Sequence, residues 1–241
     1  MLNNIKIILV EPQHTGNIGA TARAMKTMGL HHLVLINPEN FPHKDAYIRA
    51  THATDILDRC EVKDNLKVVI NDCSLVIGTS TRDRGAYVPA LNARQTAEKL
   101  IAQATSATVA LVFGKESTGL SGEDIRQCHY YGFIPTAADF SSLNLAAAVQ
   151  TFCYEIFQAS FYRENDKEAE VNPRSNNDFP KNEDLVFFYE RLEHLLTQSN
   201  FINQKHPGIV MERLKAVFKR ARLDQKELNI LQGMISSLEK H

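Results

Sequence analysis

Three segments of the chain combine glycines with polar side chains of the kind found in ligand-binding and catalytic sites. In the first, Glu11–Gly29, Gly16 and Gly19 flank Asn17, which we expect to cap a helix, and Arg23 follows away from the apolar stripe of that helix. A glycine-rich turn that opens a helix can hold an anion. The glycine spacings of dinucleotide-binding and P-loop motifs are absent. On its own this segment leaves two interpretations of Arg23 open, an active group and a solvated helix arginine.

The other two segments follow later in the chain. Gly114 ends an apolar run and Glu116 comes two residues after it. A glycine permits close backbone approach to a ligand, although an ordinary strand-to-helix turn explains these two residues equally well. Ser141, Ser142 and Asn144 precede a long apolar helix, where they can cap the helix or hydrogen-bond an adenine, a ribose or a hydroxyl substrate.

The elements that would position these segments form an α/β pattern. Short apolar runs rich in branched residues predict strands, and the stretches between them predict helices. The expected strands cover residues 5–10, 33–36, 74–79, 109–113 and 132–134, and the expected helices cover 20–28, 46–57 and 93–104. This alternation predicts a mostly parallel sheet with helices on both faces. Ligands bind at the carboxyl ends of such strands, where all three segments begin.

The rest of the chain predicts a second, helical part. Residues 143–162 form a helix that is apolar on more than one side, which fits a subunit interface and a central core helix equally well. We therefore divide the chain into an α/β domain at 1–162, a polar linker at 163–182 and a helical C-terminal extension at 183–241. Asp224 and Glu227 predict a capping box at the start of the last helix.

The composition is that of an ordinary globular protein. The chain has 241 residues, 44% hydrophobic and 23% charged, with 27 Lys and Arg against 28 Asp and Glu. No apolar run approaches the roughly 20 residues of a membrane-spanning helix. The N-terminal residues lack the pattern of a signal peptide, so we expect a cytoplasmic protein. The four cysteines are scattered without metal-ligand or disulfide spacing, so we expect neither a metal site nor disulfides.

Three ordered motifs together are far more specific than any of them alone. They read NxGxxxRxMxxMG from Asn17, FGxExxGL from Phe113 and SLNxAxAVxxxxYE from Ser142. This order resembles the SPOUT class of RNA 2′-O-methyltransferases, in particular its SpoU branch, and the resemblance continues into residues 205–208 and 227–233. It implies a trefoil-knotted methyltransferase domain, S-adenosylmethionine as cofactor, no metal, and a homodimer whose active sites are shared between subunits.

The resemblance also implies roles for individual residues. Arg23 matches the catalytic arginine of the family, and Asn17, Ser142 and Asn144 would orient the acceptor ribose. The residues that match the cofactor-binding loops are Thr79, Ser80, Thr81, Gly114, Glu116, Ile134, Ser141, Ser142 and Leu143.

Methyl transfer from a sulfonium to a hydroxyl leaves a neutral thioether, so it needs no general acid. The protein has to align donor and acceptor and assist removal of the hydroxyl proton. Arginine stays protonated in nearly all proteins, which leaves two roles for Arg23. It acts either as a perturbed base, or as a clamp for a phosphate and for the developing alkoxide.

Basic residues near the C-terminus point to RNA. Residues 205–226 contain seven Lys or Arg and two acids, a local excess of five positive charges. Lys215, Lys219 and Arg222 share helical spacing and are expected to form an RNA-binding face, extended by Arg82 and Arg84 near the expected cofactor loop. A solvated basic face is the alternative.

We therefore expect tRNA as the partner, with methylation of cytidine or uridine 32 in the anticodon loop, to which the resemblance points. The alternatives are the same reaction on another RNA, such as rRNA or another tRNA position, and a non-catalytic RNA-binding protein of the same fold.

Overall fold

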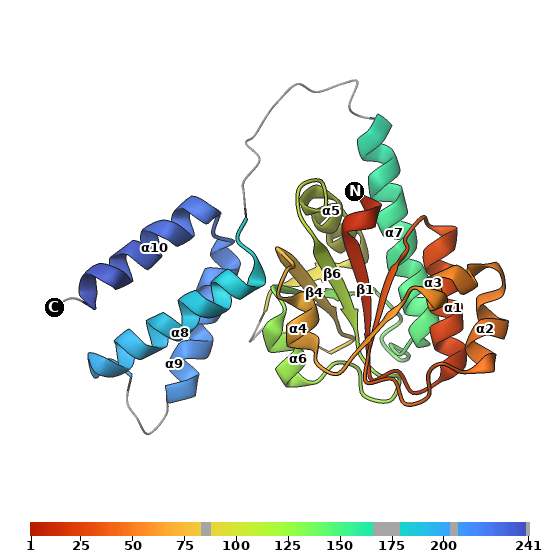
Figure 1. Cartoon of the computed structure of the whole chain (residues 1–241), viewed down its shortest axis with the longest axis horizontal. Helices are drawn as coiled ribbons and strands as arrows, with labels where there is room; N and C mark the ends of the chain where they lie inside the picture. The colour runs from red at the N-terminus through yellow and green to blue at the C-terminus, as the bar shows by residue number, and fades with distance from the viewer. Residues whose placement is uncertain (83–87, 166–178, 203–206, 240–241) are drawn as a thin grey trace.

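Seven parallel strands form one sheet at the centre of the N-terminal part of the chain (Figure 1). The structure, a computed structural model, describes residues 1–82, 88–165, 179–202 and 207–239. All paired strands run parallel, in the order β3-β2-β1-β6-β4-β7-β5. The strands are β1 Ile5–Val10, β2 His32–Ile36, β3 Glu61–Lys63, β4 Leu75–Thr79, β5 Ala90–Asn92, β6 Val109–Phe113 and β7 Tyr130–Phe133. The expected α/β class with a parallel sheet is confirmed.

Helices cover both faces of this sheet. On one face lie α1 (Thr15–Thr27), α5 (Ala93–Gln103) and α7 (Leu145–Asn165), and on the other lie the short helices α4 (Leu66–Ile70) and α6 (Gly122–Gln127). The remaining elements are the turns η1 (Leu2–Asn4) and η2 (Thr51–Ala53) and the helices α2 (Lys44–Ala50) and α3 (Thr54–Asp58), which pack beside α1.

Alternate residues of each central strand pack into two separate hydrophobic cores, one on each face of the sheet. In β1, Ile5, Ile7 and Leu9 face the α1, α5 and α7 side, whereas Ile8 and Val10 face α4 and α6. All side chains of β1 are buried, as expected for a strand covered on both faces. The long branched runs of the sequence follow from this double burial.

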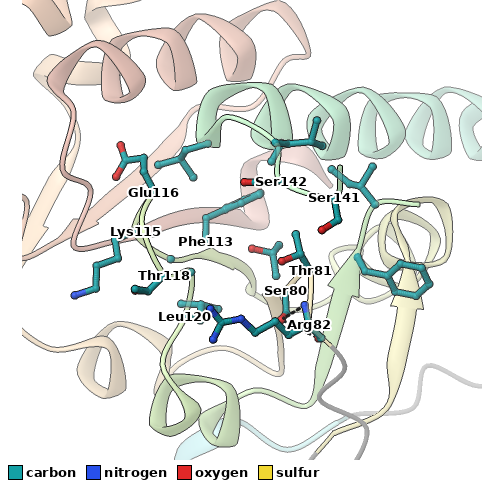
Figure 2. A pocket seen from close by; sticks show the side chains of 18 of the residues that line it. Ser80, Thr81, Arg82, Phe113, Lys115, Glu116, Thr118, Leu120, Ser141 and Ser142 are labelled. Carbon is teal, nitrogen blue, oxygen red and sulfur yellow. Dashed lines mark hydrogen bonds between the residues drawn. The ribbon is translucent and has the colours of Figure 1, made fainter. Parts of the chain in front are cut away.

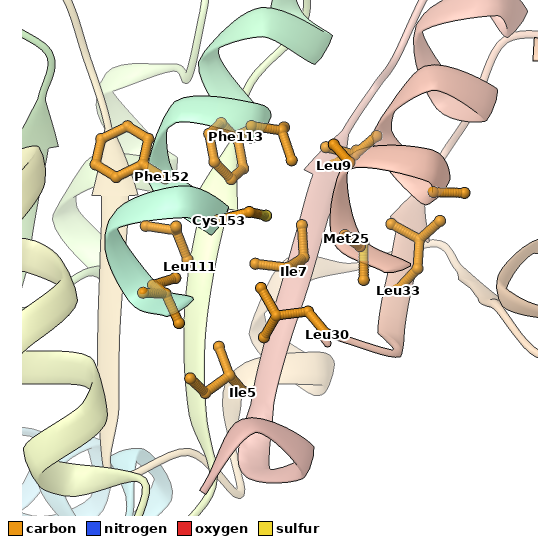
Figure 3. Packing of buried hydrophobic residues seen from close by; sticks show 14 of the residues in the cluster. Ile5, Ile7, Leu9, Met25, Leu30, Leu33, Leu111, Phe113, Phe152 and Cys153 are labelled. Carbon is orange, nitrogen blue, oxygen red and sulfur yellow. The ribbon is translucent and has the colours of Figure 1, made fainter. Parts of the chain in front are cut away.

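An aromatic contact fixes α7 against the end of the sheet (Figure 3). Phe113, the last residue of β6, meets Phe152 of α7 edge to face, with ring centroids 5.7 Å apart. Both rings are essentially inaccessible to solvent. Because Phe113 immediately precedes Gly114, this contact holds the start of α7 beside the loop that follows β6.

Several expected boundaries were wrong. Helix α1 begins at Thr15 with His14 in the N-cap position, so Asn17 lies inside the first turn instead of capping it. The helix expected over 46–57 is broken into α2, η2 and α3 at Thr51, which has a φ of 52°. The sequence analysis also missed β3, β5, α4 and α6, each only three to six residues long, because such short elements carry too few residues to show a period.

Three helices form the C-terminal unit: α8 (Asn182–Gln198), α9 (Pro207–Ala221) and α10 (Gln225–Leu238). They enclose a small core of their own, with Phe188, Met211, Leu228 and Ile235 buried in it. The capping box of Asp224 at the start of α10 is confirmed. Residues 166–178 of the expected linker lie outside the described residues. No helix in the described ranges is long and apolar enough to span a membrane.

Candidate functional site

A cavity of about 300 Å³ lies at the carboxyl edge of the sheet, where β4, β6 and β7 end (Figure 2). Three stretches of chain form its walls: residues 79–82, 113–120 and 132–145. All nine residues that the family resemblance points to as cofactor-binding line this one cavity: Thr79, Ser80, Thr81, Gly114, Glu116, Ile134, Ser141, Ser142 and Leu143. The fold thus brings together residues that are up to 64 positions apart in the chain.

The loop after β6 folds back on itself so tightly that its first residue has to be glycine. A side chain on Gly114 would place its Cβ 2.1 Å from the carbonyl carbon of Gly119 and from the backbone nitrogen of Leu120. Gly119 closes the turn with a φ of 70°, a conformation that favours glycine. Lys115 and Gly119 pair as an isolated bridge, and Lys115 forms an ion pair with Glu11 after β1. This turn gives the cavity one of its walls.

Glu116 joins this loop to α1. Its carboxylate accepts hydrogen bonds from the backbone N–H of Gln13 at 2.8 Å, the N–H of His14 at 3.1 Å and the side-chain amide of Asn17 at 2.8 Å. Partial burial alone would raise the pKa of Glu116, but the hydrogen bonds from these three groups and from its own backbone outweigh this effect and hold the pKa below its ordinary value. Glu116 is therefore an anionic clamp on the start of α1.

Asn17 continues the same network into α7. Its side-chain oxygen accepts a hydrogen bond from the amide of Asn144 at 2.9 Å, while the oxygen of Asn144 accepts from the N–H groups of Ala146 and Ala147. Asn144 is thus the side chain that caps α7, whereas the serines before it line the cavity. Asn17 thus joins Glu116, 99 positions later, to Asn144, 127 positions later, in one chain of hydrogen bonds, Glu116–Asn17–Asn144.

Arg23 lies apart from the cavity. It is exposed on α1, six residues after Asn17, or about 9 Å further along the helix axis. It is not among the described residues that line the cavity. Asn17, Ser142 and Asn144 therefore cluster within one chain, and Arg23 does not join them there.

Apolar residues of the cavity were missed by the sequence analysis. Phe113, Leu120, Leu145 and Phe152 line it together with the polar groups that were expected. Phe113 could have been found as the residue before Gly114 at the end of a predicted strand. Phe152 gave no such signal, because an apolar side chain on a buried helix is first of all a core residue.

The structure corrects the expected basic face. Lys219 and Arg222 do not face solvent: Lys219 donates to the carbonyl of Cys128 at 2.8 Å, and Arg222 donates to the carbonyl of Ser74 at 3.0 Å. The Lys215 ammonium lies 5.8 Å from the ring centroid of Tyr189. Helical spacing put these cations on one face, but that face meets the sheet domain.

The two arginines expected near the cofactor loop have different outcomes. Arg82 is exposed and lines the cavity, and its N–H donates to the hydroxyl of Ser80 at 3.1 Å. Arg84 lies outside the described residues. Within the described ranges, no group of three or more His, Cys, Asp or Glu is arranged to hold a metal ion.

Two family models match the chain. The model of the SpoU rRNA Methylase family covers residues 4–154, and that of the C-terminal domain of tRNA methyltransferase TrmJ covers residues 183–241. The first match spans the sheet and all three motifs except the last residue of the third, and the second spans the three C-terminal helices.

Similar proteins agree with these matches. The tRNA (cytidine/uridine-2′-O-)-methyltransferase TrmJ of Sodalis glossinidius is 46% identical over 239 residues, which are 99% of this chain and 92% of the relative. The crystal structure of TrmJ from Z. mobilis aligns with a TM-score of 0.79 at 28% identity, covering 97% of this chain and 98% of that one. The SpoU methyltransferase AviRb of Streptomyces viridochromogenes, solved with the cofactor AdoMet, shares the fold with a TM-score of 0.54 at 19% identity, covering 65% of this chain and 60% of that one. The chain belongs to the SpoU rRNA Methylase family, and its full-length similarity is to the TrmJ members of that family.

Proposed function

We propose that the protein transfers a methyl group from S-adenosylmethionine to a ribose 2′-hydroxyl of cytidine or uridine in tRNA. The observation that carries this proposal is the network Glu116–Asn17–Asn144 beside the cavity, because it assembles the three family motifs into one site. Full-length similarity to tRNA (cytidine/uridine-2′-O-)-methyltransferases supports the reaction and the substrate class. With tRNA as substrate, we expect the protein to work in the cytoplasm.

The lining of the cavity fits S-adenosylmethionine. Ile134 and Leu143 offer apolar surface suited to an adenine ring, and the hydroxyls of Thr81 and Ser141 offer hydrogen bonds suited to a ribose. Bound there, the cofactor supplies a methyl group activated by attachment to a sulfonium. After the transfer the sulfur is a neutral thioether, so this leaving group needs no proton from the protein. The tight turn at Gly114 keeps this side of the cavity narrow.

The residues of the chain align the acceptor. Glu116 fixes the orientation of the Asn17 amide, and Asn17 in turn holds Asn144 at the start of α7. Ser142, which lines the cavity, is placed to contact a ribose that enters from this side. Alignment is the main requirement of an in-line transfer. It lowers the activation free energy, because the two reactants have already lost their relative freedom of motion when they bind.

Arg23 is the catalytic residue that we assign to the acceptor. Because a guanidinium stays protonated, we assign it the role of a clamp: it binds a phosphate next to the target ribose and stabilises the oxygen while the hydroxyl proton passes to water. Its exposed place on α1 makes it reachable by an RNA substrate. A clamp predicts that Arg23→Lys retains part of the activity that Arg23→Ala loses, without a shift of the pH–rate profile.

We assign the working form to a homodimer in which Arg23 of one subunit completes the cavity of the other. Two observations support this assignment: Arg23 lies outside the cavity of its own chain, and α7 exposes a set of aromatic side chains. Tyr154, Phe157, Phe161 and Tyr162 are each 37% to 60% exposed. A group of exposed aromatic side chains on one helix is typical of a protein interface.

Mixing two inactive variants tests the shared site. Arg23→Ala removes the clamp and Gly114→Ala disturbs the cavity, so neither protein alone should be active. If the sites are shared, mixed dimers regain one working site and restore about a quarter of the wild-type rate. If each site lies within one subunit, mixing restores nothing.

The reaction itself is tested with labelled S-adenosylmethionine and bulk tRNA, followed by nuclease digestion and mass spectrometry. We expect a 2′-O-methylpyrimidine at position 32 of the anticodon loop, which the Arg23→Ala protein fails to form. A mark at another tRNA position or in rRNA would change the assigned substrate. Cofactor binding without transfer to any RNA would favour a non-catalytic RNA-binding protein.

A further inference from the structure

Helix α9 presents three different faces. One face packs into the C-terminal core through Met211, Leu214 and Phe218. A second carries Lys219, about a third of a turn further round the helix, and this residue contacts the sheet domain. The third face, formed by Ile209, Arg213, Val217 and Arg220, is open to solvent.

The second face is used to dock the C-terminal unit on the sheet domain. Lys219 donates to the carbonyls of Arg126 and Cys128, which end α6. Arg222 donates to the carbonyl of Ser74, just before β4. Cations are favoured at helix C-termini, where carbonyls lack helical partners. These two cations are therefore satisfied by protein carbonyls.

Other contacts complete this docking. The first turn of α8 adds two backbone hydrogen bonds, from the N–H of Asn182 to the carbonyl of Cys73 and from Glu183 to the carbonyl of Asn71. Glu212 of α9 lies 3.7 Å from Arg126 in an ion pair. Burial lowers the pKa of Lys219 to about 8, as expected for an ammonium withdrawn from water.

The solvent face carries a second set of cations. Ile209, Arg213, Val217 and Arg220 follow one another at helical spacing, with Ile209 58% exposed and Val217 46% exposed. Arg213 and Arg220 lie two turns apart, about 10.5 Å along the axis. Within the described part of the chain, neither guanidinium has a hydrogen-bond or ion-pair partner.

Helix α9 itself contributes no acidic side chain to this face. Glu212 is the only acidic residue in the sequence of α9, and it points toward the docking side, where it pairs with Arg126. A row of unpaired arginines on a rigid helix fits the phosphates of a nucleic acid, to which guanidinium groups donate in pairs.

From these contacts we infer that Arg213 and Arg220 form a phosphate-binding surface for tRNA on the solvent face of α9, while Lys219 and Arg222 only position the unit that carries it. The inference rests on the proposed function, since it takes tRNA as the partner. It assigns RNA contact to a different face of α9 from the one that the sequence predicted.

The test compares two variants that each remove two positive charges from the full-length protein. Binding of tRNA is measured by fluorescence anisotropy over a range of salt concentrations for Arg213→Gln/Arg220→Gln and for Lys219→Gln/Arg222→Gln. A residue that contacts phosphate lowers the slope of log affinity against log salt by about 1. We therefore expect the first variant to lose a slope of about 2 and to bind tRNA about tenfold more weakly at low salt.

The second variant should keep the wild-type slope, because its two cations contact carbonyls. We expect it instead to loosen the C-terminal unit, seen as a larger radius of gyration in small-angle scattering. Cofactor affinity of the first variant, measured by calorimetry, should equal that of the wild type. Arg213→Lys/Arg220→Lys retains both charges and should retain the slope.

An unchanged slope in Arg213→Gln/Arg220→Gln would overturn the inference, and so would a loss of slope confined to Lys219→Gln/Arg222→Gln. Circular dichroism at the binding temperature separates either result from unfolding. A wild-type protein that binds no tRNA at all would instead overturn the proposed function, so the two failures are distinguishable.

Discussion

Replacing Glu116 with glutamine tests the network that joins the three motifs. The substitution keeps the size and shape of the side chain but replaces one acceptor oxygen with an NH₂ donor. In the native site both oxygens accept, one from Gln13 and the other from His14 and Asn17. Either orientation of the new amide therefore sets its NH₂ against at least one N–H donor.

Asn17 cannot relieve this conflict by rotating its own amide. Its oxygen already accepts from Asn144, whose own oxygen caps α7. One opposed donor costs about 1–2 kcal/mol, the lower part of the range for an unsatisfied polar group, because Glu116 and Asn17 are only half-buried. Because 1.4 kcal/mol is tenfold in rate, Glu116→Gln should lower kcat/KM for tRNA by about 5- to 25-fold.

The assay is steady-state methyl transfer to tRNA, with the thermal midpoint measured in parallel. Glu123→Gln is the matched control, because Glu123 is exposed in the first turn of α6 and the chemical change is the same. We expect this control to keep the wild-type rate. Wild-type kcat/KM in Glu116→Gln would refute the reasoning that these hydrogen bonds align the site.

Three further changes have defined outcomes. Gly19→Ala would place a Cβ 2.0 Å from the carbonyl oxygen of Ala46, so the free energy of unfolding measured in urea should fall by about 1–3 kcal/mol. Gly233→Ala is the control, because open space surrounds Gly233, and it should be neutral or stabilising. Equal effects of the two substitutions would contradict the tight crossing of α1 and α2. Gly114→Ala would clash with its own loop at 2.1 Å, and calorimetry should then show weakened binding of S-adenosylmethionine, while unchanged affinity would separate that loop from the cofactor site. Burial, followed by the nearby positive charges, lowers the pKa of His129 well below 6.5. His129 therefore takes up a proton in the unfolded chain but not in the folded one. The free energy of unfolding should fall by about 1.4 kcal/mol when the pH is lowered from 7.5 to 5.5. His129→Asn should remove that part of the slope, and an unaltered slope would show that the ring takes up its proton in the fold.

The sheet was predictable because burial on both faces leaves a strong signal. The run at β6 is apolar at every position and the run at β1 at every position except Lys6, and glycine follows directly where β6 ends. The short β3 has three exposed residues and β5 none that is buried, so neither has an apolar run to detect. The trefoil knot that the family resemblance implies stays a prediction, because the threading of a chain leaves no periodic pattern in a sequence.

The candidate site was predictable in its residues but not in its connections. Nothing local to Glu116 indicates that its partners lie about 100 positions earlier, just before α1 and in its first turn. Likewise, helical spacing shows that Lys215 and Lys219 share a face, but not which neighbour that face meets. Those facts arise from packing between distant elements, which a single sequence does not encode locally.

The central claim is that the acceptor is a ribose 2′-hydroxyl of a tRNA pyrimidine. The most direct measurement is single-turnover methyl transfer to one tRNA carrying cytidine 32, compared with the same tRNA carrying 2′-deoxycytidine at that position. We expect one methyl group per tRNA on the first substrate and none on the second. Equal transfer to both tRNAs would contradict the assignment of the acceptor.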